Sequence, residues 1–344
     1  MAGVTSKEIA AKLGLSPSAV SLALNGKPGV SEETRRLVIA TAEKMGFNAA
    51  KLNSAITRRK RICFVFFVNK VVSIAENTTF SSFVLQGAEN AASANSHSIE
   101  VRYVRTGDSF RKQLEGFADE VDGFIVLGTD ITKESEPEIR EFLEFCAAKP
   151  VVIIDNPVNF GIADCVTNDN YGGALTAAQY LISRGCARIG YLRAHHRIST
   201  FLEREAGLNA ALDGAGLELH TVLDTEVSFG EAYKRVNEYL KNVTELPDAF
   251  FAENDVIAAA AIRAFNANGI KVPEQVSIIG FDDMPVCELT APSLSTVHAF
   301  KEELGEVAVN LLTRRFMSGN AKSNSDGVLN VSVSTKLKIR SSVK

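Results

Sequence analysis

Apolar residues in the first 47 positions of the chain recur every three or four residues, which is the spacing of amphipathic helices. Thr5 and Glu8 have the spacing of a capping box at a helix start, and Gly14 suits the left-handed end of that helix. Ser16 can cap a second helix in which Pro17 takes the first position, where a missing N–H costs nothing. The pattern therefore predicts two short helices joined by a tight turn.

A third helix is expected between Ser31, as its cap, and Gly46, as its stop. Two short helices followed by a third favour a helix-turn-helix head, a unit of the right size to enter a DNA groove. A three-helix cap on a larger domain has the same pattern and stays open as the alternative.

Beyond residue 61 the pattern changes to apolar runs that alternate with amphipathic stretches. Strands are expected at 62–68, 122–127, 151–155, 188–192, 249–252 and 277–280, and helices at 80–94, 135–148, 172–184, 203–214, 230–241 and 256–268. This alternation predicts an α/β core with parallel sheets covered on both faces. About 270 residues exceed one sheet, so two doubly wound subdomains are expected, with a ligand site where their strand ends meet.

Polar residues follow four of the expected strands at their carboxyl ends. They are Asp155-Asn156, Asn168-Asp169-Asn170, Glu253-Asn254-Asp255 and Asp282-Asp283. Each group alone is explained by a loop or a helix cap, but four at equivalent positions favour one shared site for the hydroxyls of a small ligand. A divalent metal is the less favoured alternative, because the D-x-D-x-D-G spacing is absent. The adjacent pair His195-His196 is expected at the surface, not at a metal.

Charge separates the head from the rest of the chain. Residues 1–61 hold eleven Lys and Arg against four acidic residues, a balance of +7, whereas the remainder has a balance of −11. Lys51 and the run 58–61 concentrate the positive charge just after the third expected helix, although a solvated linker has the same composition. A basic head on an acidic protein favours binding to nucleic acid, with an affinity that falls steeply with salt.

Several classes of protein are disfavoured. No apolar run reaches the roughly 18 residues of a membrane span, and no secretory signal precedes the head, so a cytoplasmic location is expected. The five cysteines lie far apart without a C-x-x-C pair, so neither a zinc site nor a disulfide framework is indicated. The phosphate-loop, G-x-S-x-G and G-x-G-x-x-G motifs are missing, so we expect no enzyme and no cofactor.

The residues resemble the lactose-repressor (LacI/GalR) family of bacterial transcription regulators over almost the whole chain. The head carries this resemblance in 4–10, 14–16, 19–21 and 24–35, and the body carries it in 167–174, 188–191, 251–258, 272–283 and 292–297. The resemblance implies a head at 1–47, a hinge helix and basic linker at 48–61, and a dimerising two-lobed core, similar to periplasmic binding proteins, at 62–344. One lobe is expected at 62–160 and 292–322, the other at 161–290 and 323–340, with crossings near 160, 290 and 322.

The resemblance also implies roles for residues of the head and hinge. Bases would be contacted from Pro17, Ser18 and Leu22, and phosphates would lie near Thr5, Ser16, Ser21, Asn25, Ser31 and Thr34. Where the family often has an arginine that reads guanine, this chain has Leu22, which suits a thymine methyl. Ile56 takes the position of a leucine that wedges into the minor groove, in a hinge that departs from the family pattern.

For the effector, the resemblance implies contacts from Arg204, Asn254 and Asp282, with Asp155 as a weaker match and Phe80 stacking on a sugar face. A surface position for Arg204 and a core position for Phe80 are the alternatives. The chain is thus expected to be a homodimeric regulator of operator DNA, most simply a repressor of a carbohydrate operon that is controlled allosterically by a small ligand, a sugar, bound between its two lobes. A purine-type corepressor system is the first alternative, and a sugar-binding protein or enzyme on the same core is the second.

Overall fold

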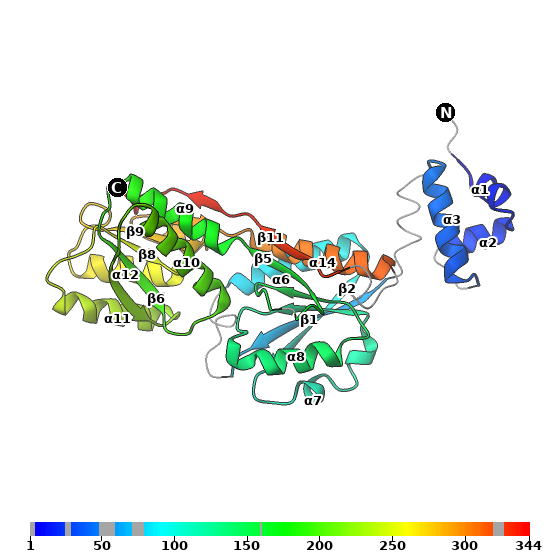
Figure 1. Cartoon of the computed structure of the whole chain (residues 1–344), viewed down its shortest axis with the longest axis horizontal. Coiled ribbons are helices and arrows are strands. Elements are labelled where there is room, and N and C mark those ends of the chain that lie inside the picture. The colour runs from blue at the N-terminus through cyan, green and yellow to red at the C-terminus, as the bar shows by residue number, and fades with distance from the viewer. Residues whose placement is uncertain (1–3, 25–28, 48–58, 71–78, 159, 319–326) are drawn as a thin grey trace.

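The structure is a computed structural model that describes residues 4–24, 29–47, 59–70, 79–158, 160–318 and 327–344 (Figure 1). The helices are α1 (Ser6–Leu13), α2 (Pro17–Leu24), α3 (Glu32–Lys44), α6 (Phe80–Ala94), α7 (Phe110–Leu114), α8 (Glu136–Phe145), α9 (Asn170–Ser183), α10 (Ser199–Gly214), α11 (Phe229–Asn242), α12 (Asp255–Ala267), α13 (Val286–Leu289) and α14 (Lys301–Ser318). The strands are β1 (Arg61–Val68), β2 (Ser98–Arg105), β3 (Gly123–Leu127), β4 (Val151–Ile154), β5 (Asp164–Asn168), β6 (Ile189–Ala194), β7 (Leu219–Thr225), β8 (Ala249–Ala252), β9 (Ser277–Asp282), β10 (Ser295–His298), β11 (Asn330–Val333) and β12 (Lys336–Lys338).

The three helices α1, α2 and α3 form a head with a small apolar core of its own. The capping box expected at the start of α1 is present, with the Thr5 amide donating to Glu8 Oε2 at 2.7 Å. Gly14 ends α1 in the left-handed region with φ 66°, as expected from its lack of a Cβ. Buried side chains fill the space between the helices: Ile9, Ala10, Val20, Ala23, Leu24, Val38 and Ala42.

Lobe 1 is built on a sheet with the strand order β11-β5-β4-β3-β1-β2, in which every neighbouring pair is parallel. Its central strand β1 is apolar on both faces, because alternate side chains join different clusters: Phe64 packs on the side of α6 and α14, and Val65 on the side of α7 and α8. The continuous apolar run that predicted this strand is thus the signature of burial on both faces.

Lobe 2 repeats the plan with the order β12-β10-β9-β8-β6-β7, and here only β12 is antiparallel to its neighbour. Side chains of α9 and α10 join one apolar cluster of this sheet, and those of α11 and α12 join the other (Figure 1). The expected fold, a helical head followed by two doubly wound parallel-sheet subdomains, is confirmed.

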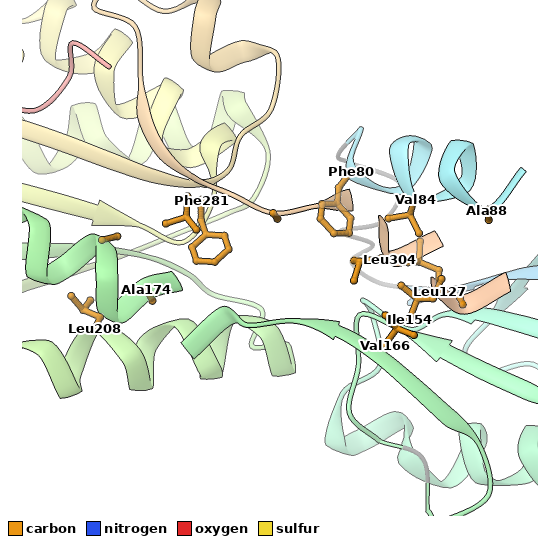
Figure 2. Close-up of a cluster of buried hydrophobic side chains, with 14 of the residues drawn as sticks. Phe80, Val84, Ala88, Leu127, Ile154, Val166, Ala174, Leu208, Phe281 and Leu304 are labelled. Carbon is orange, nitrogen blue, oxygen red and sulfur yellow. The ribbon is translucent and has the colours of Figure 1, made fainter. Parts of the chain in front are cut away.

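A single apolar cluster continues from lobe 1 into lobe 2. Figure 2 shows Phe80 and Leu304 of lobe 1 on one side and Phe281 and Leu208 of lobe 2 on the other. Each lobe brings two helices close on this face through glycine: a Cβ at Gly87 of α6 would meet the backbone of α14, and one at Gly207 of α10 would meet the backbone of α9. The two lobes therefore use the same device for close helix packing.

The chain crosses between the sheets later than the expected 160, 290 and 322. Strand β5 pairs in lobe 1 before α9 begins in lobe 2, and β10 pairs in lobe 2 before α14 packs on lobe 1. The last segment contributes β11 to lobe 1 and β12 to lobe 2, so its whole length does not belong to lobe 2 as expected. These strands escaped the sequence pattern because they are short and polar, as Asp164–Asn168 and Ser295–His298 show.

Candidate functional site

The exposed face of α2 carries the residues expected to contact DNA bases. Pro17, Ser18 and Ser21 are exposed, and Leu22 is half-buried. The Arg35 guanidinium donates to the backbone oxygens of Leu22 and Ala23 at 3.3 and 3.1 Å, which holds the end of α2 against α3. The helix thus presents small polar side chains on a rigid support.

The residues expected near phosphates lie mostly at helix starts. Ser16 Oγ accepts from the Ala19 amide at 3.1 Å, and Ser31 Oγ accepts from the Thr34 amide at 3.1 Å, so both serines are helix caps as expected. Helix N-termini with free amides are suited to anions. Thr5 is exposed as well.

Two expected DNA contacts, Asn25 and Ile56, lie outside the described residues, as does most of the expected hinge at 48–61. The end of the basic run is placed against the core. Lys60 Nζ lies 2.8 Å from Asp122 Oδ1, and Arg61 pairs with Glu100 and Glu120 of lobe 1. These two cations thus balance acidic residues of the core, which leaves less of the run for DNA than its composition indicated.

Arg204 forms the centre of a buried polar cluster at the carboxyl ends of the lobe 2 strands. It is only 4% exposed, so the alternative of a surface arginine is wrong. Its Nε donates to Asn170 Oδ1 at 3.0 Å, its Nη1 to the Glu253 carbonyl at 2.6 Å, and its Nη2 to Asp282 Oδ1 at 2.8 Å. Its Cζ lies 3.8 Å from the centre of the Phe281 ring. The guanidinium is therefore fixed in position and its charge is matched.

Asp155 approaches this cluster from lobe 1, directly after β4. The Thr129 hydroxyl donates to Asp155 Oδ2 at 2.7 Å. Burial raises the pKa of Asp155 to about 7, an effect that Thr129 and the positive charge of Arg204 only partly offset. Burial also raises the pKa of Asp282, against the opposing charges of Arg204 and Lys301.

The backbone at these strand ends is strained. Asp155, Asp282 and Asp283 have φ values of 64°, 108° and 56°, in the region that favours glycine. Non-glycine residues held there cost on the order of 1–3 kcal/mol each and gather at binding sites. The strained residues lie at two of the four strand ends that the sequence pattern singled out.

Asn254 and Phe80 have structural partners of their own. Asn254 caps α12, with its Oδ1 accepting from the Ile257 amide at 2.9 Å. Phe80 begins α6, is 7% exposed, and belongs to the apolar cluster shared by the lobes (Figure 2). Both lie near the junction, Asn254 at the end of β8 and Phe80 at its lobe 1 side.

Residues not expected from the sequence complete the cluster. Lys301 of α14 is 3% exposed, and its Nζ donates to the carbonyl oxygens of Asp282, Ala299 and Asp283 at 2.6, 3.1 and 3.3 Å. It thereby ties a lobe 1 helix to the end of a lobe 2 strand. A lysine in the first turn of an amphipathic helix reads as a surface residue, so no sequence signal indicated this role.

A second link between the lobes comes from Asn156, whose Nδ2 donates to Ser199 Oγ of α10 at 3.1 Å. Glu253, also buried, accepts from Arg197 Nη1, the Ala194 amide and the Tyr191 hydroxyl. Three donors on one carboxylate fix it firmly, so Glu253 supports the cluster from lobe 2.

The described residues contain no group of three or more His, Cys, Asp or Glu that could hold a metal ion. Within the same ranges, no helix is long and apolar enough to cross a membrane. His195 is exposed and His196 half-buried. None of the five cysteines forms a disulfide and all are buried, and burial raises the pKa of Cys63 to about 12.

Two family models match the chain. "Bacterial regulatory proteins, lacI family" matches residues 5–49, and "Periplasmic binding protein-like domain" matches residues 178–343. The first range covers the helical head, and the second covers most of lobe 2 together with α14, β11 and β12.

Similar proteins cover nearly the whole chain. The HTH-type transcriptional repressor PurR of Mannheimia succiniciproducens is 29% identical over 345 residues, which cover 99% of this chain and 98% of the relative. The solved complex of the transcriptional regulator CelR with cellobiose has a TM-score of 0.69 at 25% identity, covering 98% of this chain and 99% of that one. The lac repressor dimer, bound to operator and the anti-inducer ONPF, has a TM-score of 0.70 at 19% identity, covering 99% of both chains.

The exposed α2 face, the two-lobed core and the strained polar strand ends agree with these matches. The chain thus joins a DNA-binding head that matches the lacI family of bacterial regulatory proteins to a core similar to periplasmic binding proteins, and it is a DNA-binding transcriptional regulator controlled by a small ligand.

Proposed function

We propose that the chain is a repressor whose core binds an uncharged sugar at the junction of its two lobes. Asp155, Arg204, Asn254 and Asp282 would supply the hydrogen bonds, and Phe80 would border the sugar from lobe 1. The repressor would bind operator DNA as a homodimer, and the sugar would change how the lobes hold the two heads. A coupling of about 1–3 kcal/mol is typical of such allostery.

The proposal that the ligand is uncharged rests on the ion pair between Arg204 and Asp282. The guanidinium is matched by Asp282 at 2.8 Å, so it has no net charge to offer a phosphate or a carboxylate. The nearest further titratable side chains, Asp155 and Glu203, are carboxyl groups whose pKa values are raised by burial, so they offer an anion no positive charge. Sugar hydroxyls both donate and accept, so they suit carboxylates and a guanidinium that are already fixed.

A corepressor-dependent regulator of the purine type is the second candidate. The relative reported above is a repressor named PurR, and it matches the chain from end to end at 29% identity. The CelR complex with cellobiose, at 25% identity, supports a sugar instead. Catalysis is not proposed, because the relatives are repressors.

A thermal-shift experiment separates these ligands. The purified protein is heated with cellobiose, D-ribose or D-glucose, with glucose 6-phosphate, and with hypoxanthine or guanine. A ligand at 100 times its Kd adds about 2.7 kcal/mol of stability. We expect a raised melting midpoint with a neutral sugar and none with the sugar phosphate. If only a purine raised the melting midpoint, the proposal of a sugar ligand would give way to that of a purine corepressor.

The head is proposed to read DNA through Pro17, Ser18 and Leu22, with Thr5, Ser16, Ser21, Asn25, Ser31 and Thr34 near phosphates and Ile56 wedged into the minor groove. Duplexes selected by the protein from a random library would give the operator. Ile56→Ala should then weaken binding to the selected duplex far more than binding to random DNA. Equal losses on both duplexes would remove the wedge role, and a selected site without two-fold symmetry would count against a dimer.

The homodimer is proposed to use an apolar groove of lobe 2. Phe229, Ile262, Val286 and Leu289 are among the residues that line a volume of about 310 Å³, and Leu289 is 83% exposed. The lac repressor, which has the same fold, forms a dimer, and this supports a two-fold assembly of the present chain. Leu289→Asp should produce monomers in sedimentation equilibrium, whereas Leu202→Asp, on another exposed apolar residue, should not.

A further inference from the structure

Asn168, at the end of β5, is a buried carboxamide without partners. It is 2% exposed, and neither its Nδ2 nor its Oδ1 has a hydrogen bond to any described residue. Two other asparagines close by are fully engaged: Asn156 Nδ2 donates to Gly128, Ile131 and Ser199, and Asn170 bonds to Glu203 and Arg204. A buried amide with both groups unpaired is rare in native proteins and requires an explanation.

The register of β5 places this amide toward the junction of the lobes. Alternate residues of a strand share a face. Asp164 pairs with Arg315 of α14, and Val166 joins the cluster of Phe80 and Leu304, so Asn168 lies on that same face at the carboxyl end (Figure 2).

Asn168 lies at the same sheet edge as the proposed sugar contacts. Strand β5 pairs with β4, which leads directly into Asp155. Two residues further along the chain, the Asn170 side chain accepts from Arg204. Its Nδ2 donates to the backbone carbonyl oxygen of Asn168 at 3.2 Å. Asn168 thus lies on the strand next to the one that leads into Asp155, and two residues before the asparagine that binds Arg204.

We propose that Asn168 is a specificity-determining residue, whose carboxamide donates to one hydroxyl of the bound sugar and accepts from a neighbouring hydroxyl. The inference rests on the proposed sugar site and adds a residue to it. A carboxamide offers a donor and an acceptor side by side, which matches a pair of adjacent hydroxyls. A ligand without that pair leaves the amide unpaired in the complex, so sites of this kind reject such analogues strongly.

The role predicts opposite effects on the free protein and on its complex. Removing a buried amide that has no partner costs the ligand-free protein nothing, because an unmade hydrogen bond is itself unfavourable. Removing it from the complex breaks two hydrogen bonds to the sugar. A structural role would instead lower the stability of the ligand-free protein.

The test uses the full-length variants Asn168→Leu and Asn168→Ala, where the alanine variant covers the case in which leucine does not fit. Asn268→Leu is the control for an asparagine whose amide has partners: Asn268 is exposed at the other end of α12 from Asn254, and its Nδ2 donates to Asn237 and Ala264 at 2.7 and 2.8 Å. Each protein is melted with and without cellobiose, D-ribose and D-glucose, and the Kd of any sugar that binds is measured by calorimetry.

We expect the ligand-free midpoint of Asn168→Leu to equal or exceed that of the wild type, while its sugar Kd rises roughly tenfold to a hundredfold. The control should melt lower and keep its Kd. An unchanged Kd in both Asn168 variants overturns the inference, as does a ligand-free midpoint that falls in both variants as it does in the control. If no sugar shifts the wild type, the proposed sugar site fails first and the role of Asn168 falls with it.

Discussion

The two lobes have the same architecture but prepare their strand ends differently. In lobe 2 the charged groups at the strand ends are paired within the protein, as Arg204 with Asp282 and Glu253 with Arg197 show, and only His196 Nε2 is buried without a hydrogen bond to a described residue. In lobe 1, among the described residues, Asp155 has one side-chain donor, Thr129, and the side chain of Asn168 has none. Lobe 2 therefore offers a preformed surface, whereas polar groups of lobe 1 gain partners only if a ligand arrives. This asymmetry suits a sensor, because ligand binding then changes lobe 1 more than lobe 2.

The largest expected effect comes from removing the central charge of lobe 2. Arg204→Met leaves Asp282 buried and unpaired, which should cost about 3–5 kcal/mol of unfolding free energy. The midpoint of urea unfolding checks this. The matched control is Arg315→Met in lobe 1, where Arg315 pairs with Asp164 at 2.6 Å in a similarly buried position. Both variants should lose stability, but only Arg204→Met should also lose the response to ligand. A full ligand response in Arg204→Met would contradict the preformed surface.

The next largest effect is expected at the closely packed helix pairs, where similar substitutions should destabilise both lobes by similar amounts. Gly87→Ala pushes a methyl into the backbone of α14 at Glu302, and Gly207→Ala pushes one into the backbone of α9 at Tyr171. Each overpacked contact should cost about 1–3 kcal/mol, measured by thermal melting. Gly214→Ala is the control, because a Cβ there meets nothing within 4 Å. It should leave the midpoint unchanged or raise it, because alanine favours a helix more than glycine does. Equal losses at all three positions would show that the close helix contacts at Gly87 and Gly207 are not the cause.

A pH effect of similar or smaller size should belong to lobe 1. The pKa of Asp155 is raised to about 7 in the folded protein, above the usual value of about 3.9 in an unfolded chain. Between these values the folded state holds the extra proton, so stability falls as the pH rises from about 4 to 7, by at most roughly 1.4 kcal/mol per pH unit. Asp155→Asn should remove this slope. Urea midpoints of both proteins across pH 5 to 8 measure the difference, and parallel curves would show that Asp155 ionises normally.

The sequence predicted much of this molecule, and its failures have physical causes. Strands buried on both faces, such as β1 and β8, could be predicted from their apolar runs. The helices of the head could be predicted from the caps at Thr5, Ser16 and Ser31. Short polar strands such as β5 and β10 did not, which misplaced the crossings.

At the site, the strand-end pattern singled out Asp155, Asn168 and Asp282 as a group. The resemblance added Arg204, which the structure brings to the same cluster. The role of Lys301 could not be predicted, because its burial depends on contact between the two lobes and local sequence patterns do not report such contacts.

The smallest effect tests the hydrogen bond that Thr129 donates to Asp155 in lobe 1. Thr129→Val removes the hydroxyl that donates to Asp155 at 2.7 Å, and because that donation favours the charged carboxylate, its loss should raise the pKa of Asp155 further. The cost should be about 0.5–1.5 kcal/mol at pH 8 and smaller at pH 5.5, where the carboxyl is protonated in both proteins. Thr176→Val, which removes an exposed hydroxyl bonded to the Gly172 carbonyl, should show no such dependence on pH. If Thr129→Val costs the same at both pH values, the hydroxyl does not act on the charged form of Asp155, and the pH dependence of lobe 1 has to come from another group.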